Sequence, residues 1–142
     1  VVVADFDCVF LKNISELIAY NSDYDMGLRK LKDNECLPWE SITAGFSIFM
    51  PNENSKQFLK TTSEYLKSTL TDDSVQWWVD QNALECAGRF SKNYKVANLM
   101  GILNSYVIIP TGSQSAKLSL LSAGLKKIKT STTKESDPGY FV

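Results

Sequence analysis

The sequence predicts an α/β fold, and three observations lead to this prediction. The chain has 142 residues, and its opening apolar run, residues 1–4, is typical of a strand buried in a sheet. A second apolar run, residues 44–50, is ended by Pro51. Residues 53–70 then show apolar side chains at helical spacing. Because strand patterns and helix patterns alternate along the chain, we expect a sheet flanked by helices.

The region between the two apolar runs predicts short elements. A helix is expected over residues 14–20, with Asn13 or Ser15 at its N-terminus. A short strand over 25–28 and a polar loop over 30–39 follow it. Three side chains supply the apolar contacts of the helix: Leu17, Ile18 and Tyr20.

The helix over residues 53–70 has the clearest pattern, and it is expected to pack one face on the sheet. That face holds Phe58, Thr62, Tyr65, Leu66 and Leu70. A second helix is expected over 75–87, with Gly88 as its stop. Residues 95–99 and 106–109 read as strands, and 117–128 as a helix or a strand. We therefore predict one domain, residues 1–128, and a loose polar tail, residues 129–142.

Composition excludes several classes of function. Fifteen basic residues nearly balance sixteen acidic ones, so neither a nucleic acid nor an anionic membrane is expected as a partner. No apolar run approaches the roughly 18 residues of a membrane span. Cys8, Cys36 and Cys86 are too few and too scattered for a disulfide framework or a zinc site. They fit a reducing compartment, which predicts a cytoplasmic location.

The chain contains no histidine. This removes the usual general base, the Ser-His and Cys-His nucleophile pairs and most zinc enzymes. Any chemistry must therefore use carboxylates, a metal ion or backbone dipoles.

Two acids, Asp5 and Asp7, directly follow the first apolar run. In an extended backbone their side chains point to the same side, and Phe6 points to the other. Two carboxylates at the carboxyl end of a buried strand can hold one hard divalent cation, Mg²⁺ or Mn²⁺. The alternative is that either acid caps the turn or helix that follows.

Asp80 and Gly45 are two further unusual positions. On a helical wheel Asp80 falls among apolar side chains, where an unpaired carboxylate is costly. Either a buried hydrogen bond or ion pair satisfies it, or it projects into a site and meets a polar ligand. Gly45 interrupts an apolar strand, which indicates either a close approach of a ligand or backbone, or a bulge.

Three motifs occur in an order that resembles GT-A glycosyltransferases, members of the nucleotide-diphospho-sugar transferase superfamily. Residues 5–7 (DFD) after an apolar strand resemble the DxD motif of that family. Residues 43–49 (TAGFSIF) are similar to its N-A-G-hydrophobic strand, and residues 78–84 (WVDQNAL) to its W-x-D-Q-x-x-L helix start. The resemblance covers about residues 1–88 and implies a mixed sheet flanked by helices.

The resemblance implies a metal-dependent transfer of a sugar from a nucleotide-diphospho-sugar donor to an acceptor that the sequence does not identify. The DxD acids of the family hold Mn²⁺ or Mg²⁺, which bridges the diphosphate of the donor. Carried over, Asp7 becomes the direct metal ligand, and Asp5 contacts the metal or the ribose. A metal that neutralises charge on the departing diphosphate makes a histidine base unnecessary.

The other two motifs imply contacts to the sugar. Gly45 and Ala44 would line the sugar pocket through their backbone. Asp80 would contact the sugar or act on the acceptor, with Gln81 beside it. Asp80 is therefore the candidate catalytic residue.

The chain also departs from the family pattern. It has no late histidine to serve as a further metal ligand, and Thr43 stands where the pattern begins with Asn. The strands that bind the nucleotide base in GT-A domains precede the DxD strand, and none precedes it here. We therefore interpret the chain as the C-terminal part of such a domain, possessing the donor-site motifs without the leading strands.

Two other interpretations remain. The first motif also resembles that of haloacid-dehalogenase-type phosphatases, in which Asp5 would be the nucleophile and Asp7 the acid/base. Such enzymes need a later acidic pair at a strand end, whereas Asp72 and Asp73 sit in a polar turn, and Cys8 replaces the usual glycine.

The second alternative is a non-catalytic module that associates with itself or with a partner. The loss of leading strands would expose a sheet edge and favour a homo-oligomer. Three tryptophans could contribute to such a surface, although core packing is their commoner role: Trp39, Trp77 and Trp78.

Overall fold

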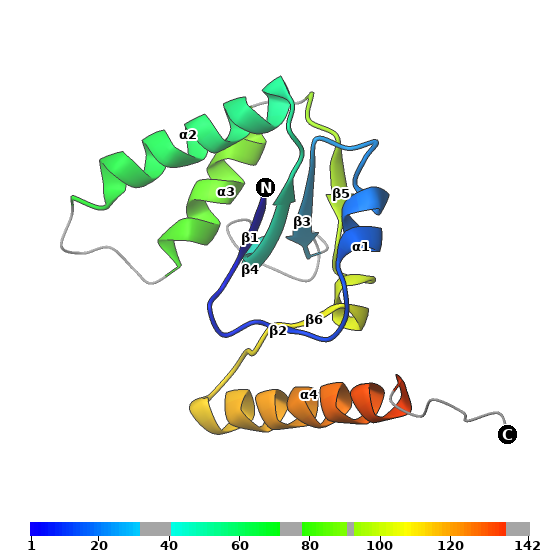
Figure 1. Ribbon diagram of the computed structural model, residues 1–142. Helices are drawn as coiled ribbons and strands as arrows, with labels where there is room; N and C mark the ends of the chain where they lie inside the picture. The colour runs from blue at the N-terminus through cyan, green and yellow to red at the C-terminus, as the bar shows by residue number, and fades with distance from the viewer. Residues whose placement is uncertain (32–40, 72–77, 91–92, 136–142) are drawn as a thin grey trace, which may run out of the picture.

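A computed structural model describes residues 1–31, 41–71, 78–90 and 93–135, and it shows a mixed sheet flanked by helices (Figure 1). The strands are β1 (Val2–Ala4), β2 (Val9–Phe10), β3 (Met26–Lys30), β4 (Ile42–Phe49), β5 (Val96–Asn98) and β6 (Val107–Ile108). The helices are α1 (Ser15–Tyr20), α2 (Glu53–Thr69), α3 (Val79–Phe90) and α4 (Gln114–Glu135), with one turn of 3-10 helix at Leu103–Ser105. The predicted α/β class is confirmed at this level.

The main sheet has four strands in the order β1-β4-β3-β5. Strands β1 and β3 are each antiparallel to β4, and β5 is parallel to β3. Three strands therefore run in one direction, with β4 running against them, and the carboxyl ends of β1 and β3 share one edge of the sheet (Figure 1). A separate two-stranded sheet joins β2 to β6.

Each face of the main sheet carries its own apolar core. On one face, Leu17 of α1 packs with side chains of β4 and of the segment after β5. On the other, Phe58 of α2 and Ala87 of α3 pack on β3 and β4. Because strand side chains alternate, β4 serves both cores, with Phe46 and Ile48 on the first face and Phe49 on the second.

Helix α2 begins where the sequence predicts, and a buried carboxylate fixes this point. Asn52 caps the helix, because its side-chain oxygen accepts a hydrogen bond from the Ser55 backbone N–H at 2.9 Å. The Asn52 amide in turn donates to Asp25 Oδ1 at 3.0 Å. Asp25 Oδ2 accepts from the Asn54 amide at 3.1 Å and from the Lys95 backbone N–H at 2.8 Å. Asp25 thus ties the start of β3 to α2 and to the strand β5.

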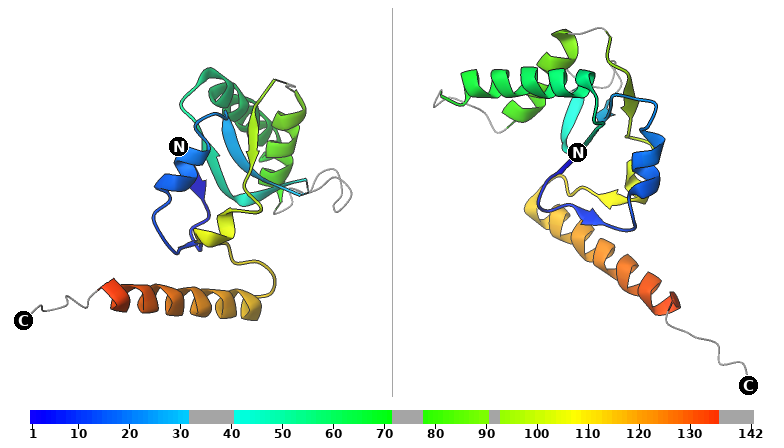
Figure 2. Two further views of the ribbon diagram at one scale, coloured as in Figure 1. Left: turned by 90° about the vertical axis from the view of Figure 1, so that its right-hand side faces the viewer. Right: turned by 45° about the horizontal axis from the view of Figure 1, so that its top comes forward.

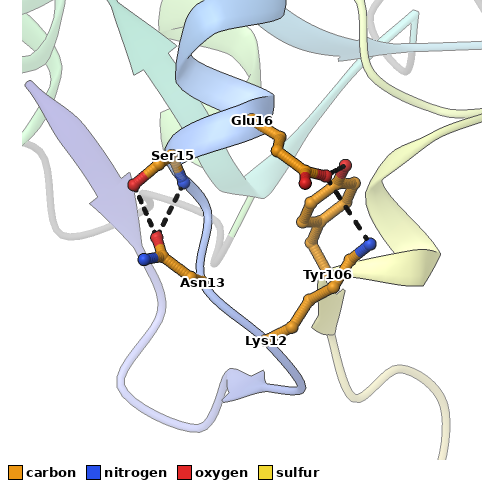
Figure 3. A network of polar contacts seen from close by, with 5 residues as sticks. All are labelled: Lys12, Asn13, Ser15, Glu16 and Tyr106. Atoms are coloured by element: carbon orange, nitrogen blue, oxygen red, sulfur yellow. Dashed lines mark hydrogen bonds and ion pairs between the residues drawn. The ribbon is translucent and has the colours of Figure 1, made fainter.

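Polar contacts hold the short helix α1 in place (Figure 3). Asn13 Oδ1 accepts hydrogen bonds from the backbone N–H and the hydroxyl of Ser15, at 2.9 and 2.6 Å, and forms a turn before the helix. The N-cap residue is Ile14, so the prediction of Asn13 or Ser15 in this position was wrong. The Tyr106 hydroxyl donates to Glu16 at 2.7 Å, which raises the pKa of that phenol. Lys12 Nζ lies 3.9 Å from Glu16 and 3.9 Å from the centroid of the Tyr106 ring.

Helix α4 lies beneath the lower end of the sheet, and its C-terminal half extends away from the body (Figures 1 and 2). It is attached through the β2–β6 pair, where Gly124 is buried. A Cβ at Gly124 would lie 2.7 Å from the Ile108 Cδ1 atom, so a larger residue would require the end of the Ile108 side chain to move. Among the described residues, no helix combines the length and the apolar character needed to cross a membrane.

The structure corrects several predicted elements. Strand β1 is an edge strand and not a buried one, since Val1 and Val3 are 78% and 51% exposed. Tyr20 and Ile18 are also largely exposed and not core contacts. Helix α3 passes through Gly88, because a glycine that keeps helical dihedrals weakens a helix without ending it.

The C-terminal segment also differs from its prediction. Residues 129–135 continue α4 and are not loose, because no glycine or proline interrupts the segment. The Thr130 hydroxyl donates to the carbonyl of Lys126 or Lys127 within the helix. The predicted loop over 30–39, the turn containing Asp72 and Asp73, and Trp39, Trp77 and Cys36 lie mostly or wholly outside the described residues.

Candidate functional site

A cleft of about 630 Å³ lies at the carboxyl end of β1. Its walls come from four parts of the chain: the segment after β1, the sheet at β3 and β4, the first turn of α3, and the segment that runs from β6 into α4. The lining residues are Asp5, Phe6, Asp7, Arg29, Thr43, Ala44, Asp80, Gln81, Ile109, Pro110, Thr111, Gly112 and Lys117. The structure thus brings together five of the six residues singled out in the sequence, and the sixth, Gly45, lies next to them.

Asp5 and Asp7 reach the cleft from a turn. The Cys8 N–H donates to the Asp5 carbonyl at 3.1 Å, which closes a turn over residues 5–8. The expectation of an extended backbone with Phe6 facing away was therefore wrong, and Phe6, which is fully exposed, lines the same cleft. The turn is anchored on β4, because the Asp5 N–H and the Cys8 thiol both donate to the Gly45 carbonyl, at 2.9 and 3.3 Å.

Strand β4 is irregular where it meets this turn. Gly27 pairs with Ile48 and Arg29 with Thr43, so β4 carries three more residues than β3 in this interval. Gly45 lies within it with φ +101°, a backbone conformation that other residues rarely adopt. The Arg29 guanidinium donates a hydrogen bond to the Ala44 carbonyl at 2.9 Å. This bond satisfies a carbonyl that the bulge removes from the hydrogen-bonding pattern between the strands.

The close approach at Gly45 explains this residue in physical terms. A Cβ at this position would lie 3.1 Å from Ile109 Cγ2, 3.3 Å from Asp5 Oδ2 and 3.4 Å from an Arg29 nitrogen. Gly45 therefore forms a bulge and also lets three cleft residues converge on one point. The two alternatives considered for the sequence, a bulge and a close approach, are both present.

Replacing Gly45 with alanine should destabilise the protein by about 1–3 kcal/mol, because the residue would be strained and its methyl group would crowd the cleft wall. Chemical denaturation measures the change. Gly101→Ala is the matched control, since a Cβ there meets nothing within 4 Å. Equal unfolding free energies for the two variants would show that the bulge tolerates a side chain.

The electrostatics of the cleft combine carboxylates with two cations. Lys117 Nζ lies 3.4 Å from Asp7 Oδ2, and these side chains are 43% and 23% exposed. Burial lowers the pKa of the Arg29 guanidinium from its usual high value, while the Asp5 carboxylate acts in the opposite direction. Burial raises the pKa of the Cys8 thiol, and Asp5 raises it further. Cys8 is therefore a protonated structural group and not an activated nucleophile.

Asp80 lies at the start of α3, and its position differs from the prediction. Its side chain is exposed and not buried among apolar neighbours, because it stands in the first turn of a helix that begins at Val79. Asp80 Oδ1 accepts from the Gln81 backbone N–H at 2.7 Å, which suits a carboxylate in a first helical turn. It lines the cleft and also a smaller neighbouring cavity of about 180 Å³ that contains Gly45 and Ala44. The geometry leaves Asp80 accessible to a ligand.

Sequence reasoning missed the two basic residues of the site, Arg29 and Lys117. Arg29 falls between the predicted strand over 25–28 and the predicted loop over 30–39, and Lys117 begins a segment predicted as a helix or a strand. The one signal was the loop over residues 110–113, whose proline and glycine mark a turn before a helix. The structure places Lys117 at the cleft wall.

Asp5 and Asp7 are an oxygen-only donor set suited to a hard divalent cation. In the part of the chain that the structure describes, no three carboxylate or thiol side chains gather closely enough to hold a metal by themselves. A cation at this turn would therefore complete its shell with water or with oxygens of a substrate. The Lys117 ammonium already places positive charge at Asp7, whose side chain is partly exposed.

Comparisons with protein families, with curated proteins and with solved structures found no match to this chain. The functional interpretation therefore depends on the geometry of the cleft and on the motifs of the sequence.

Proposed function

We propose that this chain is part of a GT-A-like glycosyltransferase domain, which transfers a sugar from a nucleotide-diphospho-sugar with the help of Mn²⁺ or Mg²⁺. One observation carries the proposal. Asp5 and Asp7 after β1, Ala44 in β4, and Asp80 and Gln81 in α3 line the same cleft, although as many as 76 positions separate them in the sequence. These are the positions that the family resemblance assigns to the donor site.

The metal would be held at the turn over residues 5–7. Asp7 is the direct ligand in this proposal, and Asp5, whose N–H anchors the turn on Gly45, is the second carboxylate or the contact to ribose. When bound, the cation neutralises charge on the departing diphosphate. The protein contributes a turn that is fixed before the ligand arrives, because two hydrogen bonds hold it on β4.

The sugar would occupy the part of the cleft between the bulge of β4 and the start of α3. Asp80 is exposed there, and only one of its carboxylate oxygens accepts the Gln81 N–H. The other oxygen can accept a hydroxyl of the sugar or take part in activating the acceptor. The absence of a Cβ at Gly45 leaves room at the cleft wall beside Ile109, Asp5 and Arg29.

A thermal melt with Mn²⁺ alone, and then with Mn²⁺ and UDP, GDP or their sugar conjugates, tests the proposal. A ligand that binds the native state stabilises it by about 2.7 kcal/mol at a hundredfold excess over its Kd. We expect an increase in Tm that needs both the metal and one nucleotide. A melt unchanged by every combination would contradict a working donor site.

One observation favours a second candidate, a module that acts by association. The edge strand β1 exposes Val1 and Val3, and an unprotected apolar edge is a pairing surface. Sedimentation at several concentrations separates the two candidates. A dimer together with an unchanged melt would favour this function over sugar transfer.

A further inference from the structure

We propose that Lys117 is the resident counter-cation of Asp7 and that a divalent cation must displace it in order to bind. The inference rests on the proposed function, because it presumes a cation at the turn over residues 5–7. It adds an exchange of cations at Asp7. The Lys117 ammonium group contacts the Asp7 carboxylate when no metal is bound, and it moves away when the metal binds.

The first step is the geometry of the pair. Lys117 Nζ and Asp7 Oδ2 are 3.4 Å apart, and 110 positions separate the two residues in the sequence. The contact is therefore made by the fold and not by neighbours on one helix. Both side chains line the cleft, so a ligand that enters the cleft meets the pair.

The second step is that the start of α4 holds Lys117 in position. Gly112, with φ +88°, turns the chain at the cleft wall, and the Ser113 carbonyl accepts the Lys117 N–H at 2.9 Å. About two turns further on, Gly124 packs against Ile108 of β6. The backbone of Lys117 is thus fixed, and the flexible part is its side chain, which can leave Asp7 without movement of the helix.

The third step is electrostatic. A hard divalent cation binds carboxylate oxygens directly, so a metal on Asp7 would lie close to an ammonium group that contacts the same carboxylate. The two positive charges repel at this separation, so the metal and Lys117 compete for Asp7. Arg29 is different, because it donates to the Ala44 carbonyl and is retained by the backbone. Of these two cations only Lys117 must move.

Lys117→Gln tests the exchange, with the Kd for Mn²⁺ measured by calorimetry in the absence of nucleotide. We expect the variant to bind Mn²⁺ about 2- to 5-fold more tightly than the unmodified protein, since removing one competing ion pair between partly exposed groups corresponds to a change of this order. Lys126→Gln is the matched control, because it removes the same charge from an exposed position of the same helix. That control should change the Kd by less than twofold.

A second measurement uses the unmodified protein. In a titration with Mg²⁺ followed by NMR, the side-chain signal of Lys117 should shift in step with binding, while that of Lys126 should not. An Mn²⁺ affinity of Lys117→Gln that equals or falls below that of the unmodified protein would overturn the exchange and leave the proposed function intact. If neither protein binds Mn²⁺, the metal site itself is wrong and both proposals fall.

Discussion

Replacing Asp7 with asparagine is expected to abolish Mn²⁺ binding while leaving the metal-free Tm nearly unchanged. The amide keeps the shape of the carboxylate but lacks the charge that a hard cation requires. The substitution also removes the ion pair with Lys117, in which both groups are partly exposed, and such a pair contributes about 0.2–1 kcal/mol. Melts of both proteins over a range of Mn²⁺ concentrations measure the two effects separately.

Asp23→Asn is the control for this experiment. Asp23 is exposed and lies outside the cleft lining, so its variant should respond to Mn²⁺ like the unmodified protein. The metal assignment is refuted if Asp7→Asn gives the same increase in Tm with Mn²⁺ as the unmodified protein. A loss confined to Asp7→Asn would place the cation at the turn after β1.

The sequence predicted the parts of the fold whose patterns are strong. The apolar run of β4 and the helical spacing of α2 each report a local property: a strand buried on both faces, or a helix with one buried face. Phe58 is fully buried, as its place on the predicted face requires. Such patterns can be recognised in a sequence because each face of a strand or helix contacts one kind of environment, either the apolar core or the solvent.

The errors occur where neighbours in space decide the environment. The run over residues 1–4 is apolar like a buried strand, yet β1 lies at the edge of the sheet, and its position there depends on which strands pair with it. The helical wheel placed Asp80 among apolar side chains, but Asp80 stands in the first turn, where the helix faces the cleft. A wheel describes the faces of a helix and not its ends.

For a related reason, the sequence predicted the carboxylates of the candidate site but neither of its two cations. Asp5, Asp7 and Asp80 were noticeable because each carboxylate follows or interrupts an apolar pattern. Lys117 and Arg29 lie in segments where a basic residue is ordinary, and only the tertiary fold brings them to the carboxylates. Charge complementarity between distant segments has no local signature in a single sequence.

Asp25 leads to the second large prediction, which concerns the fold and not the site. Asp25→Ala should lower the free energy of unfolding by about 3–5 kcal/mol, because three hydrogen bonds to a charged acceptor, each contributing about 1.5–3 kcal/mol and not fully additive, are lost together. The carboxylate is 8% exposed and accepts hydrogen bonds from the side chains of Asn52 and Asn54 and from the Lys95 N–H. Its removal would leave these donors without their acceptor and would weaken the cap of α2. Urea denaturation provides the measurement.

The effect of Asp25 can be separated from that of a surface charge. Asp23→Ala removes an exposed carboxylate two positions earlier and should change stability by no more than about 0.5 kcal/mol. Asp25→Asn should fall between the two, because one amide oxygen still accepts while the new NH₂ group faces donors. If Asp25→Ala proves as stable as Asp23→Ala, the three segments that meet at this carboxylate must be held by their apolar contacts alone. A large loss would instead identify a single buried charge as the junction between β3, α2 and β5.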